Sequence, residues 1–454
     1  LIFYSPFGKN AVSGTEDYGT IDEAYLNVFD GVDQNLPTDS RYRIGVTSHN
    51  NNVRNQYAYI NKSGTNSYAS LTNGAVAEFA QFLEASSYQI IQPLRNGIDD
   101  RRIVNQALGI KYILTEEKYA DYLPSDYTIR SDLSALNSNM LVAETENEAP
   151  FAYVETNGLS YTDAQKLHPV QRERLLANAV ILEDHSEVNL EAPIKLGELK
   201  THKGHWAEAE NIHGQENLSL NQPMEITVDE ANSQMTLTFD RPEELVGQEV
   251  FIYFEDIEFT PPEKFLKNQA STAFRLKVNF NKQNKGILQS DRYTFSSYFK
   301  RENILIHLNE VSEAEDTLTV TFQNAGDYSF GNVSVISRPF DEEQATKEAL
   351  VKKENALEIN TFTDEQIKGS IQASKDGMLV TNIPYTPGWQ AYVDGQKVPT
   401  EKVNIGFVGL PISAGEHAVE FVYQTPYLKL GVVMSVLGIV ALVGYEFIFR
   451  RYLK

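Results

Sequence analysis

The stretch "PGWQAYVDGQKVPTEKVNIGFVGLPISAGEHAVEFVYQT" (Pro387–Thr425) leads almost directly into the apolar run "LKLGVVMSVLGIVALVGYEFIFRRYLK" (Leu428–Lys454). Asp394-Gly395 is a dipeptide typical of a two-residue β-hairpin turn. Alternate residues on either side of it share one strand face: Trp389, Ala391 and Val393, then His417, Val419, Phe421 and Tyr423. A small antiparallel β-unit therefore adjoins a segment that has the composition of a membrane span.

The apolar run has the length needed to cross a bilayer. From Leu430 to Phe449, about 20 residues carry one charge, Glu446, and at 1.5 Å per residue they cover roughly 30 Å. A buried core helix is the alternative, but the residues that flank the run favour a span. Tyrosines suit the two interfaces and a basic terminus suits the cytoplasm: Tyr427, Tyr445, Tyr452, Arg450, Arg451 and Lys454. We expect a transmembrane helix at 429–449, a cytoplasmic tail at 450–454, and all preceding residues outside the cell.

The first residues, "LIFYSPFGKN", contain neither a Met start nor the basic and long apolar regions of a signal peptide. A large ectodomain with a C-terminal span needs a device that exports its N-terminus. We expect the chain to be a fragment in which Leu1 to Tyr4 is the outer end of a preceding membrane helix. A mature start at Leu1, after removal of a signal peptide, is the alternative.

Composition excludes several classes of partner and site. The 454 residues suit about three domains, and 41% are hydrophobic, which is enough to build cores. Because 62 acidic residues outnumber 39 basic ones, the net charge of -23 argues against nucleic acid as a partner. The chain has no cysteine, so disulfides and thiolate metal sites are impossible.

Residues 1–205 mix helix and strand patterns, which predicts an α/β extracytoplasmic domain. Ser40–Ser48 and Lys111–Thr115 have strand patterns, and Asn73–Ala85 reads as a helix capped by Asn73. A short helix is expected to begin at Asp99 or Asp100 and to stop at Gly109. A further helix is expected over 163–179, broken at Pro169.

From Trp206 the hydrophobic period changes to two, which predicts an antiparallel β-sandwich of jelly-roll type over 206–345. Each run is expected to have one wet and one dry face. The apolar positions are Met235, Leu237, Phe239, then Phe274, Leu276, Val278, Phe280, then Ile304, Ile306, Leu308, then Leu318, Val320 and Phe322. A charged helix beginning at Asp341 is expected as a spacer, followed by a membrane-proximal β-domain over 346–428. The predicted class is α+β, mainly β.

Several ordered motifs resemble the YfhO family of bacterial polytopic membrane proteins. They are "NSYASLTNGAVAEFAQFL", "ALGIKYILT", "APFAYVETNG", "GWQAYVDGQKV", "NIGFVGLPISAGEHAVEFVY" and the terminal span. The resemblance implies a multi-pass glycosyltransferase with a GT-C-like arrangement. Such a protein would move a sugar from a polyprenyl-phosphate donor to a cell-envelope glycopolymer, for example lipoteichoic acid of Gram-positive cells.

The resemblance assigns no catalytic residue to this chain. In GT-C enzymes the catalytic carboxylate lies in an early extracytoplasmic loop among the membrane helices, which the matching motifs do not include. What the resemblance implies is a β-unit that seats the ectodomain on its last helix. The implied partners are the glycopolymer acceptor, the lipid bilayer and an N-terminal membrane domain, and we expect no cofactor in this chain.

Local chemical motifs are weak. His202, His205 and His213 lack the helical i, i+4 spacing of a zinc site, so we expect no metal. Ser297-Tyr-Phe-Lys300 matches the spelling of a serine acyl-enzyme without the companion Lys-Thr-Gly. Asp99-Asp100, which Arg101 and Arg102 follow, reads as ordinary capping rather than as a catalytic pair.

Three aromatic residues are candidates for sugar contacts, because sugar rings stack on flat apolar faces: Trp206, Trp389 and Tyr392. Trp389 alternates with Val393, which favours core packing for it. Two functions remain open. The chain is the ectodomain of a membrane glycosyltransferase, or it is a membrane-anchored carbohydrate-binding or adhesion protein without catalytic activity. Several preceding spans would favour the first, and a signal peptide the second.

Overall fold

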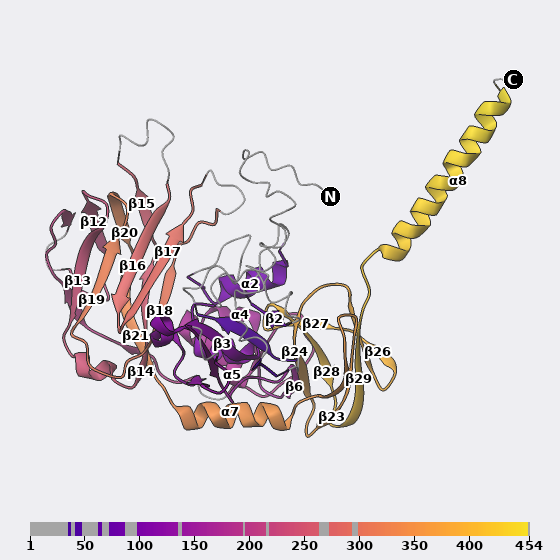
Figure 1. The fold of residues 1–454 in the computed structure, drawn as a ribbon, viewed down its shortest axis with the longest axis horizontal. Helices are drawn as coiled ribbons and strands as arrows, with labels where there is room; N and C mark the ends of the chain where they lie inside the picture. The colour runs from indigo at the N-terminus through magenta and orange to yellow at the C-terminus, as the bar shows by residue number, and fades with distance from the viewer. Residues whose placement is uncertain are drawn as a thin grey trace.

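A computed structural model describes residues 35–37, 41–47, 62–65, 72–86, 98–134, 139–193, 196–214, 218–262, 272–292 and 298–452. Leu1–Tyr4, Ser297 and Lys454, on which expectations rest, lie outside these ranges. The fold is mainly β, as predicted. Figure 1 shows a β-sandwich at the left, an α/β region at the centre, a β-domain at the right and the helix α8 projecting from it.

The central region contains a five-stranded sheet of order β2-β1-β3-β5-β4. Its strands are β1 (Arg43–Val46), β2 (Ser63–Gly64), β3 (Ile110–Glu116), β4 (Thr128–Ile129) and β5 (Met140–Glu144). β1 lies within the predicted strand and pairs parallel with β2 and β3, whereas β5 pairs antiparallel with β3. The 3₁₀ helix η4 (Glu117–Tyr122) follows β3.

Helix α2 (Gly74–Phe82) begins as predicted, because the Asn73 side chain accepts hydrogen bonds from two backbone N–H groups of the first turn. The prediction for Asp99 and Asp100 was wrong. Helix α3 (Arg102–Ala107) begins after them and has no side-chain cap. Both aspartates have positive φ and are buried, so their carboxylates serve other groups: Asp99 accepts from the Ser86 N–H at 2.7 Å.

A six-stranded sheet joins segments that are far apart in the sequence. Its order is β6 (Ala152–Glu155), β24 (Gly377–Pro384), β28 (Phe407–Ile412), β27 (Glu401–Val403), β8 (Val180–Leu182) and β7 (Gly158–Ser160). Strands from the predicted domains 1–205 and 346–428 therefore share one sheet, which a boundary drawn along the sequence does not capture. The helix expected over 163–179 is two helices, α4 (Tyr161–Gln165) and α5 (Pro169–Asn178), with the break at Pro169 as predicted.

The sandwich packs a five-stranded sheet against two four-stranded sheets around one hydrophobic core. The first sheet contains β10 (Gly204–Trp206), β13 (Ser233–Phe239), β19 (Thr317–Phe322), β16 (Phe274–Phe280) and β17 (Gln283–Gln289). The second contains β11 (Ile212–Gly214), β12 (Met224–Val228), β20 (Gly326–Phe330) and β15 (Glu258–Thr260). The third contains β18 (Ile304–Glu310), β14 (Gln248–Glu255), β21 (Asn332–Pro339) and β9 (Lys200–Thr201). The 3₁₀ helix η5 (Pro242–Leu245) precedes β14.

The expectation of one wet face was wrong for the third sheet. β18 is buried at six consecutive positions, and β14 and β21 are similar. The outward side chains of these strands pack against α5 in a separate cluster: Val170, Phe251, Tyr253, Leu305 and Ile336. The central region covers this face, so its strands read as continuous apolar runs rather than as alternating ones.

Helix α7 (Glu342–Glu354) runs beneath the central region toward the β-domain (Figure 1). The Asp341 side chain accepts from the Gln344 N–H at 2.9 Å, which is the predicted cap. Beyond it, a five-stranded sheet packs on the six-stranded one around a shared core. Its order is β22 (Glu358–Phe362), β23 (Gln366–Ala373), β29 (Gly415–Tyr423), β25 (Trp389–Val393) and β26 (Gln396–Val398). The turn between β25 and β26 is Asp394-Gly395, as predicted.

Helix α8 (Leu428–Tyr452) is long and apolar enough to cross a membrane over Leu428–Phe447, by its length and composition. The large apolar side chains of that segment are about half exposed or more, and none of the segment is buried against the body of the protein. A core helix would bury one stripe or its whole surface. The alternative of a buried core helix therefore does not describe α8.

Candidate functional site

The three aromatic candidates do not come together. Trp206 lies on β10 in the core of the sandwich and is 7% exposed. Trp389 and Tyr392 lie on β25 in the other β-domain. Because they are three positions apart on one strand, their side chains point to opposite faces of its sheet. Trp389 packs on the Tyr423 ring with centroids 5.4 Å apart, and the Tyr392 hydroxyl lies 3.3 Å from the Gln390 side chain.

The three histidines also have separate environments. His202 is buried, and its Nε2 lies 2.8 Å from the Ser337 hydroxyl. His205 and His213 are exposed and pair with different aspartates, Asp240 and Asp229. Within the described ranges, no group of three or more His, Cys, Asp or Glu residues could hold a metal ion.

One Ser–His–Asp arrangement appears that the sequence reading missed. Ser413 Oγ lies 3.2 Å from His417 Nε2, and His417 Nδ1 lies 2.8 Å from Asp394 Oδ2. These contacts match the roles of nucleophile, base and orienting carboxylate. The hydrogen bond from His417 also lowers the pKa of the Asp394 carboxyl.

The surrounding contacts give this triad a structural role. His417 Nε2 lies 3.1 Å from the Ser413 carbonyl oxygen, as close as it lies to the Ser413 hydroxyl, so the ring lies against the backbone of the residue that it would have to activate. The adjacent Ala414 N–H donates to Asp376 Oδ1 at 2.8 Å, so it is not available to stabilise an oxyanion. Asp394 also accepts from the Ala418 N–H. The triad thus fastens the β25–β26 hairpin to the start of β29.

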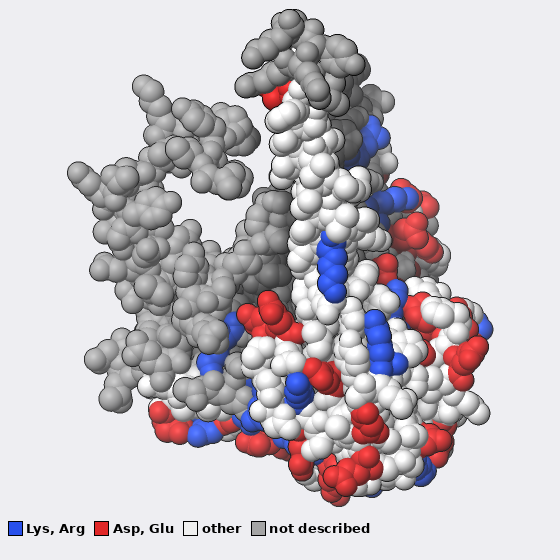
Figure 2. Space-filling model, turned by 90° about the vertical axis from the view of Figure 1, so that its right-hand side faces the viewer, with Lys and Arg blue, Asp and Glu red and all other residues white. Residues whose placement is uncertain are grey.

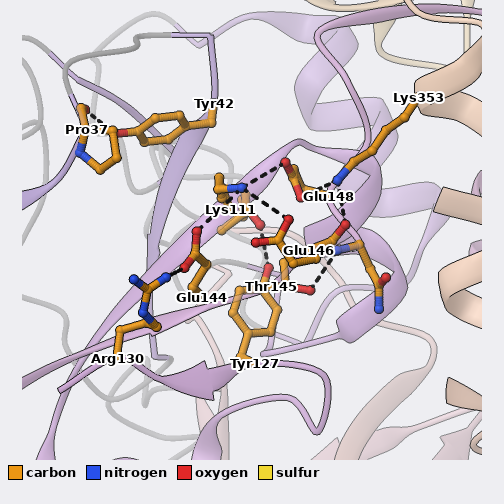
Figure 3. A network of polar contacts seen from close by, with 12 residues as sticks. Pro37, Tyr42, Lys111, Tyr127, Arg130, Glu144, Thr145, Glu146, Glu148 and Lys353 are labelled. Carbon is orange, nitrogen blue, oxygen red and sulfur yellow. Dashed lines mark hydrogen bonds and ion pairs between the residues drawn. The ribbon is translucent and has the colours of Figure 1, made fainter. Parts of the chain in front are cut away.

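A second cluster gathers charges where β3 meets β5 (Figure 3). Lys111 Nζ lies 3.5 Å from Glu144, 3.8 Å from Glu146 and 3.3 Å from Glu148. Arg130 pairs with Glu144, and Lys353 of α7 lies 3.2 Å from Glu148 Oε2. The period of two in Glu144, Glu146 and Glu148 is the sequence signal that could have indicated this cluster.

The chemistry of this cluster is that of an ion-pair network. Burial alone would lower the pKa of Lys111, but the carboxylates, Glu148 foremost, raise it above its ordinary value. A lysine that stays protonated cannot act as a base or a nucleophile. Because Lys353 also donates to the Glu146 carbonyl at 2.6 Å, the network ties α7 to the central region.

The strongest candidate for ligand binding is the outer face of the second sandwich sheet. Strand pairing aligns its outward side chains in two rows. One row runs across four strands: His213, Thr227, Asp327 and Thr260. The other runs across three: Glu225, Ser329 and Glu258. We call these seven residues the polar face. At a strand spacing of about 4.8 Å, the longer row spans about 14 Å.

The polar face lines a hollow of about 440 Å³. It offers carboxylates and hydroxyls in close array, and the Thr227 hydroxyl donates to Asp327 Oδ1 at 2.7 Å. Such groups accept hydrogen bonds from hydroxyl-rich ligands, and the side-chain hydroxyls also donate to them. Among the described residues that line the hollow, none is lysine or arginine, although Lys300 outside it pairs with Glu258 at 3.1 Å. The face therefore suits a neutral polyol or sugar better than a polyanion.

The sequence holds a signal for this face. In "MEITV" and "GDYSF" the apolar residues point into the core, and the polar residues between them point outward. The period-two runs identified from the sequence did not include these two segments. Which strands lie side by side, and hence which polar residues form a row, depends on strand order.

Residues 16–435 match the family described as bacterial membrane protein YfhO. The chain belongs to the YfhO family. The uncharacterized protein YfhO of Bacillus subtilis (strain 168) is 23% identical over 357 residues, which are 77% of this chain and 36% of that protein. This YfhO-family chain thus spans about a third of the length of that relative.

Solved structures that resemble this YfhO-family chain do so weakly. The arabinofuranosyltransferase AftD from Mycobacteria is 9% identical, with 69% of this chain and 29% of that chain covered and a TM-score of 0.16. The CBM22-1–GH10 modules of Clostridium thermocellum xylanase 10B are 10% identical, with 29% and 25% covered and a TM-score of 0.18. Scores this low carry no argument about fold or function.

Proposed function

We propose that this chain is the extracytoplasmic part of a polytopic bacterial membrane glycosyltransferase of the GT-C type. The observation that carries the proposal is the match to a membrane-protein family over residues 16–435. The full-length enzyme would transfer a sugar from a polyprenyl-phosphate donor to a cell-envelope glycopolymer. Folded domains attached to an apolar helix, as in this chain, are the arrangement expected of an extracytoplasmic part that is anchored in the membrane. The terminus beyond α8 would then be cytoplasmic.

Within that enzyme, the role we assign to this chain is to hold the acceptor. A general base must lie within about 2.6–3.2 Å of the proton that it removes. A lipid-borne phosphate stays at the membrane surface, whereas the polar face lies on the sandwich, beyond the central region from α8 (Figure 1). The proposed catalytic carboxylate accordingly belongs to the membrane region of the full-length protein.

The charge of the polar face defines the acceptor further. Three carboxylates would repel a polyanion within a Debye length of about 8 Å at physiological salt. The polar face would therefore bind a polymer such as lipoteichoic acid through its uncharged sugar residues rather than through its phosphates. Hydrogen bonds to sugar hydroxyls supply this kind of recognition without a net charge on the ligand.

The test uses membranes that contain the full-length protein, a labelled polyprenyl-phosphate sugar and a purified envelope polymer. The key variant removes the three charges of the polar face while keeping side-chain shape: E225Q/E258Q/D327N. If these groups contribute about 1.4 kcal/mol together, the acceptor KM rises about tenfold while kcat changes little. A matched control, E243Q/E313Q/D316N, neutralises three exposed carboxylates elsewhere on the sandwich and should leave KM unchanged.

The two parts of the proposal fail separately. If the wild-type protein transfers no sugar from any polyprenyl-phosphate donor but still binds the polymer, the alternative function is favoured, a membrane-anchored carbohydrate-binding or adhesion protein. If transfer occurs and the key variant behaves like the control, the polar face does not hold the acceptor.

A further inference from the structure

The connection between the β-domain and α8 is short and fixed by hydrogen bonds. Four residues, Gln424–Tyr427, join β29 to α8. The Gln424 N–H donates to the Gly388 carbonyl at 2.9 Å, just before β25. The Gln424 side chain accepts from Gln390 Nε2 at 3.3 Å, and the Leu428 N–H donates to the Thr425 carbonyl. Four residues span at most about 14 Å, so the start of β25 lies close to the start of α8.

Aromatic rings gather at this junction. Trp389 and Tyr423 are cross-strand partners on β25 and β29, and both are half-buried. A Cβ atom on Gly388 would lie 2.3 Å from the Tyr423 ring, so glycine at this position allows the ring to lie against the backbone. Tyr427 is 84% exposed and the next residue, Leu428, is 59% exposed. We call Trp389, Tyr423 and Tyr427 the aromatic edge.

Indole and phenol rings with one apolar and one polar end prefer the boundary between lipid headgroups and acyl chains. In Figure 2, α8 stands as a nearly uncharged column above a body whose surface carries both signs of charge. The aromatic edge lies where the column meets the body, as the connector requires. We propose that the aromatic edge inserts into the interfacial layer of the bilayer that α8 crosses, and so fixes the tilt of the ectodomain on its helix.

The inference rests on α8 being in a bilayer. It requires neither a direction of insertion nor a catalytic activity. A lobe attached by one helix can swing about the connector, and a second contact at the surface removes that freedom. This second contact would hold the polar face, the proposed acceptor site, at a fixed distance from the membrane.

The charges beside the aromatic edge indicate which lipid property matters. The Tyr423 N–H donates to the Glu365 carbonyl, which places the exposed Asp364 and Glu365 next to this end of the sheet. Lys429 of α8 and Lys397, which donates to the Gln390 side chain beside Trp389, offset these carboxylates, so the aromatic edge has neighbours of both signs. Insertion should therefore depend on the aromatic rings and not on the charge of the lipid.

The chain has two tryptophans, which makes the test direct. The whole chain is placed in lipid nanodiscs, and tryptophan emission is measured with spin-labelled lipids that quench at headgroup level or at the midplane. Trp389 emission, taken as wild type minus W389F, should fall by about a factor of two or more with the headgroup quencher, since interfacial residues lie about 5–10 Å deep. Emission of W389F, which reports Trp206 in the sandwich core, should be unaffected.

A positive control shows whether α8 is inserted when Trp389 is not quenched. In the W389F background, Tyr427→Trp places an indole immediately before α8, and this indole must be quenched if α8 spans the disc. Quenching of that indole without quenching of Trp389 would overturn the proposal. Nanodiscs of zwitterionic and of anionic lipid should give equal Trp389 quenching. Quenching that occurs only with anionic lipid would show a charge-driven contact instead.

Discussion

Glu249 on β14 offers the sharpest test of how the sandwich is attached to the central region. Its side chain is 2% exposed and lies 2.8 Å from Arg338 Nε and 3.4 Å from Arg102 Nη2. Arg338 also makes an ion pair with Glu173 of α5 at 2.6 Å. Burial alone would raise the pKa of Glu249, but Arg338 and Arg102 hold it well below its ordinary value.

The substitution E249Q keeps the shape of the side chain and removes its charge. Arg338 would keep its ion pair with Glu173, whereas Arg102 would lose the carboxylate that lies against it in a site shielded from water. Removing one partner of a buried ion pair typically costs about 3–5 kcal/mol. We expect E249Q to lose about 3 kcal/mol, near the lower limit, because glutamine can still accept one hydrogen bond from Arg338.

The assay is urea unfolding of the detergent-solubilised chain, followed by Trp206 fluorescence in a W389F background. An unchanged m value with a lower midpoint would report lost stability rather than an altered unfolded state. The control, E313Q, removes an exposed carboxylate from the same sandwich and should cost about 0–1 kcal/mol. Equal midpoints for E249Q and E313Q would refute the claim that this ion pair fastens the two regions.

Unfolding at low pH provides a second test of the Glu249–Arg338 ion pair. Because the folded-state pKa of Glu249 is depressed, its contribution is complete above the ordinary pKa of 4.5 and is lost as the pH falls well below that value. The difference between wild type and E249Q should therefore be constant from neutral pH to about pH 5 and should shrink only in stronger acid.

Three further predictions follow from topology, burial and packing. On intact cells, Gln396→Cys should react with a membrane-impermeant thiol reagent and Lys454→Cys should not; labelling at Lys454 would reverse the orientation. Burial, then Lys200, lowers the pKa of His202 to about 4, so His202 alone should cost about 2 kcal/mol of stability between pH 7 and pH 5. In denaturant titrations His202→Asn should remove this share and leave that of His168, whose pKa burial also lowers to about 4. Residues 199–340 expressed alone should keep a strand-dominated circular dichroism spectrum but bind a hydrophobic dye, because Phe251, Leu305 and Ile336 lose their cover; a dye-silent fragment would contradict this.

Local sequence signals predicted several helix starts and turns of this protein. Asn73 and Asp341 begin helices because their side chains satisfy N–H groups that the helix itself leaves unpaired. Pro169 separates α4 from α5, and Asp394-Gly395 turns the β25–β26 hairpin. The same kind of prediction failed for Asp99 and Asp100. They look like a cap, but their partners, Ser86 and Lys285, are distant in sequence.

The polar face depends on contacts between segments that are far apart in the sequence. The apolar helix and the period-two strands follow from residues within a few positions of one another, and the acidic balance follows from composition alone. Strand order depends on the tertiary fold, which aligns His213, Thr227, Asp327 and Thr260 from four separate segments into one row. The tertiary fold also covers the outer face of β14 and joins β6 to β24 across more than two hundred residues. Packing between distant segments sets those features, and the hydrophobic period of a strand does not specify which other segment packs against it.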